Sequence, residues 1–287
     1  MEKRFSYCKF TIEEEKQIVK EYQDGESMAA LGAKWSCSPS TVKNILKAYN
    51  IKGRTLSQAR RNYIGYTINE NIFENIDTPE KAYWVGAMYS DGYISKTNNY
   101  TNYFGIGVAE KDKEWLEKFK NFLNYNGEVR HYQVSDGYKP GTNYVRLLIG
   151  NNKIVNDLEK LGVVEHKSKI INKLPQIPFL DDFIRGYIDG DGSLRKDYPC
   201  FQISGTQNFL QSIADYLKVD YRLRPDKSIY SLRYNTKEST YLEKRLYSNA
   251  SVYLDRKYNI AKRSFNSPLT LEDVRKNPES QGKSLEL

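Results

Sequence analysis

The sequence predicts an α+β protein made of two similar halves, preceded by a small all-helical domain. Two observations predict the halves. A short helical motif occurs at residues 83–92 and again at residues 183–192, and the same order of strand and helix patterns follows each copy. A third observation predicts the leading domain, because residues 10–50 divide into three short helices with recognisable start and stop signals.

Length and charge limit the number of domains and the kind of partner that the chain can have. A chain of 287 residues is long enough for two modest domains, or for one domain with a smaller module. Lys and Arg total 44 against 36 Asp and Glu, which gives a net charge of +8, and the chain holds 24 tyrosines. This mixture suits a polyanion as partner, although an ordinary basic protein is the alternative.

Several classes of chemistry are disfavoured by composition. Only two histidines are present, His131 and His166, and the three cysteines are scattered without a metal-ligand spacing. A zinc hydrolase, a His-dependent nuclease and a Ser-His-Asp hydrolase are therefore not expected, and the chemistry should depend on oxygen ligands. No apolar run reaches membrane-spanning length and the N-terminus lacks the apolar core of a signal peptide. We expect a cytoplasmic protein without a membrane partner, in a bacterial or phage-infected cell or in an organelle.

Residues 1–51 are expected to form the small helical domain. Thr11 and Glu14 make a capping box, and Asp24-Gly25 ends the first helix. Ser27 is placed to cap the second helix, and Ser38 the third, which has Pro39 at its first position.

The stretch LGAKWSCSPSTVKNILK resembles a helix-turn-helix of the resolvase and transposase type. Gly32 falls where the two helices would cross, and Ser36 occupies a turn position where the motif usually has glycine. Polar and cationic residues on the third helix suit base edges and phosphates in a major groove; a plain three-helix bundle with a solvated face is the alternative. The expected DNA-contacting residues of this helix are Ser40, Thr41, Lys43, Asn44 and Lys47.

Residues 52–77 are polar, basic and without sustained periodicity, so they are expected to be a linker. Its basic group is Arg54, Arg60 and Arg61, of which Arg54 is a candidate DNA contact. The linker would either lie along the phosphate backbone or act as a solvated tether.

The two motif copies read YWVGAMYSDG at residues 83–92 and FIRGYIDGDG at residues 183–192. Thr78 with Pro79 is placed to cap the first helix, and Asp181 or Asp182 the second. Each helix carries small residues four positions apart on one face, and glycine inside a helix costs about 1 kcal/mol relative to alanine. Close packing of the two helices would explain why glycine is present at these positions despite the cost. The predicted interface residues are Gly86, Ser90, Gly186 and Gly190.

Such packing would bring Asp91 and Asp191 side by side at the C-terminal ends of two helices. Both helix dipoles and the mutual repulsion disfavour a pair of carboxylates there, and a divalent cation would resolve the conflict. Carboxylate, water and phosphate oxygens suit Mg²⁺. For one copy alone, a helix-ending Asp-Gly turn is the simpler interpretation; two copies in register favour the metal site.

These motifs resemble those of the LAGLIDADG homing endonuclease family, in its single-chain form with two motif copies. The resemblance covers about residues 78–262 and implies two pseudo-symmetric αββαββα halves, residues 78–172 and 173–263, that meet through the motif helices. It implies a monomer that cuts both strands of double-stranded DNA at a specific site and leaves short 3′ overhangs. Tyr89 replaces the acidic residue found as Asp189 in the second copy, at a position that is not catalytic in the family.

The resemblance also implies the site. Asp91 and Asp191 would bind the catalytic metals, with Gly92 and Gly192 beside them, and no small-molecule cofactor is expected. The metal would be Mg²⁺, with Mn²⁺ as a substitute and Ca²⁺ binding without cleavage. The alternatives are a DNA-binding regulator without cleavage activity, and an RNA-splicing maturase, which the DNA-type N-terminal domain disfavours.

Strands are expected near residues 93–96, 103–108, 128–134 and 143–149 in the first half, and near 193–195, 201–204, 221–224 and 229–234 in the second. Period-two alternation gathers polar residues on one face of these strands, which would follow a major groove as the family's sheets do. A solvated polar face is the alternative. The candidates are Arg130, Tyr132, Arg146, Arg195, Gln202, Ser204, Arg222, Arg224, Ser231 and Arg233.

Both halves end in register, because Val164-Glu165-His166-Lys167 aligns with Leu254-Asp255-Arg256-Lys257. Similar family members have a lysine here that orders water or stabilises charge on the phosphate. Lys167 and Lys257 are therefore the candidate catalytic lysines, with Lys169 or Arg256 as substitutes; a generic basic helix end is the alternative. Residues 264–287 are expected to be a polar, mobile tail.

Overall fold

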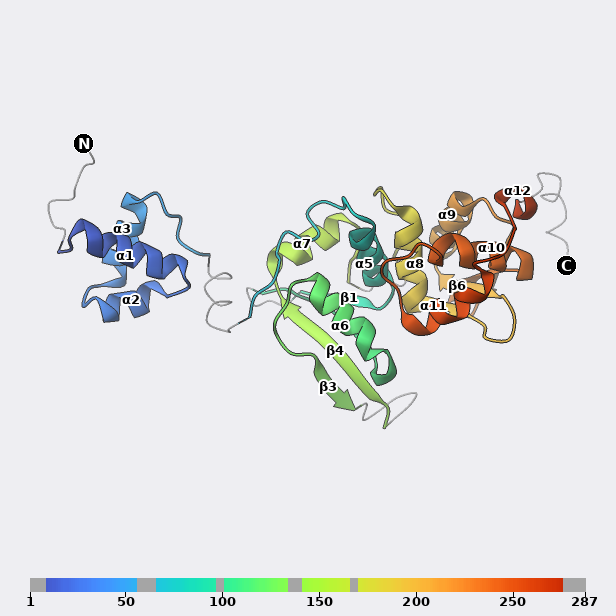
Figure 1. Ribbon diagram of the computed structural model, residues 1–287, viewed down its shortest axis with the longest axis horizontal. Helices are drawn as coiled ribbons and strands as arrows, with labels where there is room; N and C mark the ends of the chain where they lie inside the picture. The colour runs from blue at the N-terminus through green and yellow to red at the C-terminus, as the bar shows by residue number, and fades with distance from the viewer. Residues whose placement is uncertain (1–8, 56–65, 97–100, 134–140, 166–169, 276–287) are drawn as a thin grey trace. The chain divides into compact units, whose positions relative to one another are not determined.

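The computed structural model describes residues 9–55, 66–96, 101–133, 141–165 and 170–275 (Figure 1). The chain forms two compact units, Met1–Thr67 and Ile68–Leu287. No helix in the described ranges is long and apolar enough to cross a lipid bilayer.

The first unit contains helices α1 (Ile12–Gln23), α2 (Met28–Lys34) and α3 (Pro39–Ala48). Each begins at its expected cap, since the Thr11, Ser27 and Ser38 side chains accept hydrogen bonds from the main chain of the first turn. The core is formed by Phe10, Ile18, Val19, Tyr22, Leu31, Val42, Ile45 and Leu46, with Trp35 partly buried against it.

The turn between α2 and α3 keeps the close approach expected of it. A Cβ atom on Gly32 would lie 2.7 Å from the carbonyl oxygen of Cys37, so only glycine fits there. Ser36 adopts a φ of 51°, the left-handed conformation that glycine adopts most readily. Ile12, the first residue of α1, is 45% exposed.

Arg54 is not part of a free linker. Its guanidinium lies 4.0 Å from the ring centroid of Tyr22 and donates hydrogen bonds to the carbonyl oxygens of Tyr22, Gly25 and Glu26. Arg54 therefore packs the end of the first unit against residues 22–26. The expectation that this side chain contacts DNA does not fit these contacts. At the other end of the expected linker, Ile72, Phe73 and Ile76 are buried within the second unit.

The second unit is built of two αββαββα halves, as the resemblance implies. The first half contains α5 (Pro79–Ser90), β1 (Gly92–Ser95), β2 (Tyr103–Ala109), α6 (Lys113–Phe122), β3 (Arg130–Gln133), β4 (Asn143–Gly150) and α7 (Asn152–Lys160), with the short helix η1 (Glu110–Asp112) before α6. The second half contains α8 (Leu180–Asp191), β5 (Gly192–Leu194), β6 (Phe201–Gly205), α9 (Gln207–Leu217), β7 (Arg222–Asp226), β8 (Ile229–Tyr234) and α10 (Thr236–Tyr247).

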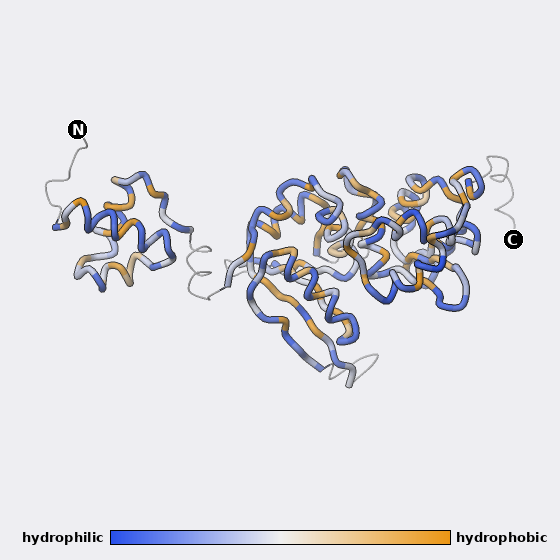
Figure 2. The backbone as a smooth tube through the Cα atoms, viewed as in Figure 1, coloured by the Kyte–Doolittle hydropathy of each residue, from blue (hydrophilic) through white to orange (hydrophobic). Residues whose placement is uncertain are grey.

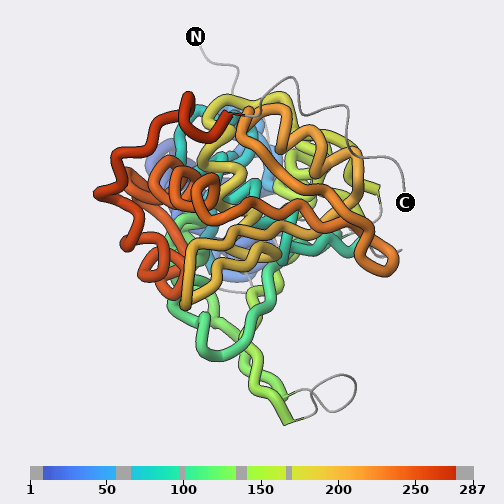
Figure 3. Tube along the Cα trace, turned by 90° about the vertical axis from the view of Figure 1, so that its right-hand side faces the viewer, coloured from blue at the N-terminus to red at the C-terminus, as the bar shows by residue number. Residues whose placement is uncertain are grey.

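Each half contains one antiparallel four-stranded sheet, with strand orders β1-β2-β4-β3 and β5-β6-β8-β7. On β4, every second residue from Val145 to Ile149 is buried, so one sheet face meets the helices and the other remains polar. Figure 2 shows this hydrophobic stretch of β4, and Figure 3 shows the β3–β4 strands extending beyond the helices. The polar sheet faces are therefore left uncovered by helices.

Two expectations about this unit are wrong. Neither Asp181 nor Asp182 caps α8, because the helix begins after Phe179 and both aspartates lie in its first turn, where they pair with Arg245 and Arg185. Of the expected tail, residues 276–287 lie outside the described residues, but the chain is packed as far as residue 275. It continues through α11 (Asp255–Ala261), η3 (Lys262–Ser264) and α12 (Leu271–Val274), where Val274 is buried.

Candidate active site and nucleic-acid interface

Helices α5 and α8 pack with their main chains in contact, and the two glycines make this possible. A Cβ atom on Gly86 would lie 1.9 Å from the carbonyl oxygen of Phe183, and a Cβ on Gly186 would lie 1.9 Å from that of Tyr83. The two contacts are related by the internal repeat. One turn later, a Cβ on Gly190 would lie 2.0 Å from the hydroxyl oxygen of Ser90, so the four predicted small residues lie at this contact.

This packing brings the two aspartates together. Asp91 is the residue that caps α5, and Asp191 is the last residue of α8. A carboxylate oxygen of Asp91 lies 3.1 Å from where a Cβ on Gly190 would stand. Burial raises the pKa of the Tyr187 hydroxyl, and the charges of Asp191 and Asp91 raise it further. Both carboxylates therefore act on one phenol, whose hydroxyl donates a 2.8 Å hydrogen bond to the carbonyl oxygen of Ser204.

Lys257 lies at the same place and is 2% exposed. Burial lowers the pKa of its ammonium group to about 8, although the negative charges of Asp189, Asp91 and Asp191 oppose that change. The ammonium donates hydrogen bonds to the main-chain oxygens of Ile188 (2.5 Å), Asp189 (2.8 Å), Gly190 (3.4 Å) and Gly192 (2.6 Å).

These contacts correct the expected role of Lys257. An ammonium group has three N–H donors, and the four carbonyl oxygens engage them all. The lysine therefore ends α8 and offsets the negative end of its dipole beneath the two aspartates, rather than reaching a phosphate itself. The other candidates, Lys167 and Lys169, lie outside the described residues.

Asp189 is the most enclosed carboxylate near the site, at 1% exposure. It accepts hydrogen bonds from the hydroxyl groups of Tyr83 and Tyr247, each at 2.7 Å, and from the main-chain N–H of Leu254 at 2.8 Å. Burial raises the pKa of Asp189, and these donors oppose the change. Since Leu254 directly precedes α11, Asp189 fixes the start of the helix that carries Lys257.

Tyr89 performs a simpler task at the equivalent place in the first half. Its hydroxyl donates a 2.5 Å hydrogen bond to the carbonyl oxygen of Leu161, and its ring packs against Phe183 and Phe209. The two motif copies are therefore related in backbone position and differ in the contacts that residues 89 and 189 make.

Helix α11 is also tied to the first half. Arg256 donates hydrogen bonds of 2.9 and 3.2 Å to the carboxylate of Asp112, and Lys118 contacts Asp255 at 2.8 Å. Arg256, considered as a substitute catalytic residue, is therefore engaged in joining the halves.

The donor set favours a hard divalent cation. The described residues include no cluster of three His, Cys, Asp or Glu side chains, so Asp91 and Asp191 act as a pair. One or two carboxylates with waters and substrate phosphates are a usual environment of Mg²⁺. Gly92 and Gly192 follow the aspartates and begin strands β1 and β5. Each glycine could offer a cation only its main-chain oxygen.

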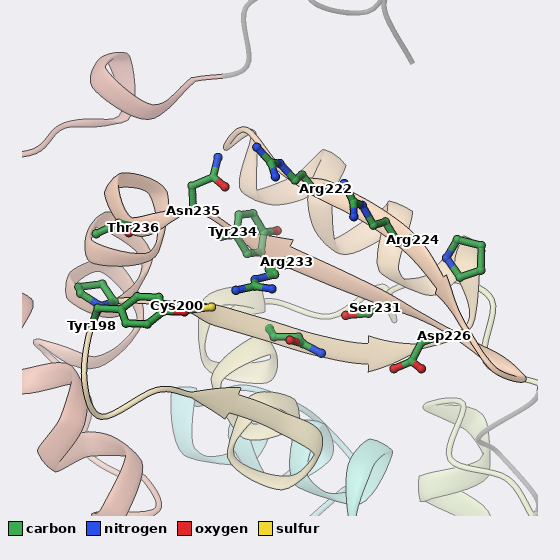
Figure 4. Close-up of a pocket in the computed structure, with 13 residues that line it drawn as sticks. Tyr198, Cys200, Arg222, Arg224, Asp226, Ser231, Arg233, Tyr234, Asn235 and Thr236 are labelled. Atoms are coloured by element: carbon green, nitrogen blue, oxygen red, sulfur yellow. The ribbon is translucent and has the colours of Figure 1, made fainter. Parts of the chain in front are cut away.

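The polar face of the second sheet gathers the expected side chains in two rows. Ser193, Gln202, Arg233 and Arg222 lie opposite one another across all four strands, and Ser204, Ser231 and Arg224 form the next row. Five of these residues line a groove of about 410 Å³ together with Tyr198 and Cys200 (Figure 4): Gln202, Arg222, Arg224, Ser231 and Arg233. Arg195 lies beside this groove, 4.9 Å from the Tyr198 ring centroid and 3.8 Å from Asp197.

The polar face of the first sheet has a different character. Arg130 lies opposite Arg146, and Tyr132 lies opposite Tyr144 with 5.8 Å between ring centroids. The guanidinium of Arg146 lies 5.2 Å from the Tyr132 ring. Gly105 and Gly107 replace side chains on the neighbouring strand, so this face is flatter and more aromatic.

Helix α3 of the first unit exposes most of its expected contacts. Ser40, Lys43, Asn44 and Lys47 are exposed, whereas Thr41 is half-buried and its hydroxyl lies 2.9 Å from that of Ser38. The hydroxyl of Ser40 lies 2.7 Å from the same atom. Three side chains of the five, Lys43, Asn44 and Lys47, thus remain for an external ligand.

Sequence reasoning missed Tyr187, the structural role of Asp189 and the pairing of Arg256 with Asp112. Period-two alternation from Arg195 could have identified Ser193 as a member of the polar row. No local sequence pattern predicts the contacts of Tyr187, Asp189 and Arg256, because each contact joins residues from different elements.

Known proteins similar to this chain are found among solved structures. No protein-family model matches the chain, and no curated protein does so either. Among solved structures, it is similar to the homing endonuclease I-WcaI bound to its DNA recognition sequence, with a TM-score of 0.47 and 14% identity over 65% of this chain and 87% of that one. It is also similar to the LAGLIDADG meganuclease I-AabMI bound to uncleaved DNA, with a TM-score of 0.45 and 14% identity over 66% and 89% of the chains. A third is I-SmaMI bound to an uncleaved DNA target in the presence of calcium ions, with a TM-score of 0.40 and 14% identity over 66% and 90%.

Proposed function

We propose that this chain is a site-specific endonuclease of the LAGLIDADG homing endonuclease family that hydrolyses both strands of double-stranded DNA. The observation that carries the proposal is the pair Asp91 and Asp191 at the ends of two helices in main-chain contact. Gly86 and Gly186 maintain this contact against the glycine cost of about 1 kcal/mol each. Two like charges held together beside a polar sheet face suit a cation and a polyanion.

In this proposal the aspartates bind Mg²⁺ at the helix ends, with Mn²⁺ as a substitute and Ca²⁺ supporting binding alone. When bound, the cation would supply Lewis-acid activation of water and stabilise the leaving oxygen. Lys257 and Asp189 act as positioning residues, because Lys257 ends α8 and Asp189 fixes the start of α11. The pseudo-symmetric halves would address the two strands, and the protein would act as a monomer. Short 3′ overhangs are what the family resemblance implies for the cut ends.

The polar sheet faces are proposed to lie in the major groove, and α3 to contact DNA outside the core target. A ribbon of two strands fits a major groove, and cationic side chains provide the phosphate attraction. The first unit would then be a helix-turn-helix module, joined to the second by a segment that includes Arg60 and Arg61.

A regulator that binds DNA without cutting it is the second candidate. It is favoured by the first unit, whose α3 residues Lys43, Asn44 and Lys47 serve binding alone. The retained pair Asp91 and Asp191 favours the nuclease, because a regulator has no need for two adjacent carboxylates beside a phosphate backbone.

The test is cleavage of a pool of duplex DNA with a randomised segment, in which cut ends are captured and sequenced. With Mg²⁺ we expect one sequence to be recovered, cut on both strands. With Ca²⁺ in its place we expect the same sequence to be enriched as bound and intact DNA. Binding of a specific sequence with no cutting in Mg²⁺ or Mn²⁺ would favour the regulator instead.

A further inference from the structure

The β7–β8 hairpin is a two-stranded ribbon that carries arginines on one face. Arg222 and Arg224 are on the edge strand β7, and Arg233 lies directly opposite Arg222 on β8. The strands are joined by a tight turn at Lys227, whose φ of 54° is left-handed. All three arginine side chains are exposed and line the groove that Figure 4 displays.

Two of these guanidinium groups are available to a ligand. Beyond the main-chain pairing of β7 with β8, the side chains of Arg222 and Arg224 have no hydrogen-bond or ion-pair partner in the described part of the chain. Arg233 differs, because the Cys200 and Tyr198 side chains contact its guanidinium from the floor of the groove. Most arginines elsewhere in the unit are engaged, as Arg185, Arg245, Arg256 and Arg263 illustrate.

The equivalent ribbon of the first half offers a weaker set. Of its two arginines, Arg146 lies against the Tyr132 ring and its Nε atom is buried. Tyr132, Tyr144 and Gly107 occupy the positions around it, so the first sheet presents rings and open backbone where the second presents guanidinium groups. A ligand with two-fold symmetry would match one sheet and not the other.

Spacing along the strand decides what the free arginines can contact. Residues two apart on a strand are separated by about 6.7 Å, and this equals about two base steps of a DNA strand at about 3.4 Å each. Arginine forms two parallel hydrogen bonds with the O6 and N7 atoms of guanine, which is the commonest specific contact in a major groove. Arg222 and Arg224 are therefore placed to address guanines two base pairs apart.

We propose that the second half recognises a guanine-containing half-site, in which Arg222 and Arg224 each bind one guanine at positions two base pairs apart. The first half recognises a half-site without such a pair, so the target is asymmetric. This inference rests on the proposed function, because it names the bases that the sheet of the same protein selects. Arg222 and Arg224 are specificity-determining residues and take no part in the proposed chemistry.

The test uses the full chain with Ca²⁺ and a randomised duplex pool, and compares wild type with Arg222→Lys and Arg224→Lys. Lysine keeps the charge and loses the planar fork that binds guanine at two points. The wild type should prefer guanine by roughly 10-fold or more at two positions separated by one base pair. Each variant should lose that preference at one of the two positions, and its affinity for the guanine-containing target should fall by a similar factor while its affinity for other sequences changes little.

Lys227→Ala is the matched control, because it removes a charge from the turn of the same hairpin. It should lower affinity equally for all sequences and reduce the salt dependence of binding, as loss of a phosphate contact does. If Arg222→Lys and Arg224→Lys keep the base preferences of the wild type, the guanine assignment is overturned and the arginines are phosphate contacts. If the wild type enriches no sequence at all, the proposed function itself fails.

Discussion

The contact between α5 and α8 yields a sharp prediction, because it leaves no space for a methyl group. In Gly186→Ala, the new Cβ atom would lie 1.9 Å from the carbonyl oxygen of Tyr83, whereas real Cβ atoms stay at least 3.0 Å from such neighbours. Both atoms belong to helical backbone, so the helices must separate by about 1 Å. A gap of that size forfeits a quarter to a half of the attraction between atoms that were in contact.

Overpacking of this kind costs about 1–3 kcal/mol, occasionally more, and we place Gly186→Ala at the upper end since backbone moves against backbone. The gain in helix propensity, about 1 kcal/mol, offsets only part of this cost. Urea unfolding followed by near-ultraviolet circular dichroism should show a free energy of unfolding lower by about 2 kcal/mol, and DNA cleavage should fall with it.

Gly107→Ala is the matched control. Its Cβ atom would lie 3.5 Å from the Tyr132 hydroxyl, an ordinary contact, so stability should change by less than about 1 kcal/mol. A Gly186→Ala protein as stable as Gly107→Ala would refute the reasoning that main-chain contact holds the two halves together.

Three further outcomes concern residues whose environments the structure defines. Ser36→Gly should stabilise the first unit by up to about 1 kcal/mol in thermal unfolding, because φ is 51° at this position; a less stable variant would show that the hydroxyl matters more than the backbone. Hydrogen bonds from Lys34, Gln17 and Trp35 lower the pKa of Glu21 to about 2, so the stability that it contributes is complete above its ordinary pKa of 4.5 and is lost as the pH falls towards 2. The NMR signal of the Trp35 indole N–H, which donates to Glu21 at 3.1 Å, should therefore titrate near pH 2, and a midpoint near 4.5 would contradict that contact. Asp189→Asn should lower the free energy of unfolding of the second unit by about 3 kcal/mol, because one carboxylate oxygen becomes an NH2 group that cannot accept a hydrogen bond from the buried donors, and Tyr89→Phe at the equivalent position should lower it by about 1 kcal/mol; equal costs would argue against the Asp189 network.

Features that depend on local pattern were predictable from the sequence. Thr11, Ser27, Ser38 and Thr78 cap the expected helices, because capping is a relation between residues three apart. Strand β4 follows from period-two alternation, which fixes its buried face. The approach of Asp91 to Asp191 was also predictable, since the repeat supplied the symmetry that a single motif lacks.

Features that depend on the assembled fold were not predictable. The position of Lys257 could be aligned, but its four carbonyl partners belong to α8 and β5, which only the fold brings to it. Arg54 has the appearance of a linker residue in the sequence, and its stacking on Tyr22 requires the chain to return to α1. The polar composition of residues 264–287 likewise gave no indication that Ser264 and Val274 are buried in the second unit.

The central claim is that Asp91 and Asp191 form one metal-dependent site for DNA cleavage. Its most direct test is the cleavage of the selected target by Asp91→Asn and Asp191→Asn in Mg²⁺, with binding measured in parallel in Ca²⁺. We expect each variant to bind the target within a few-fold of wild type and to lose double-strand cleavage by at least about 100-fold. Normal cleavage by either variant would contradict the account.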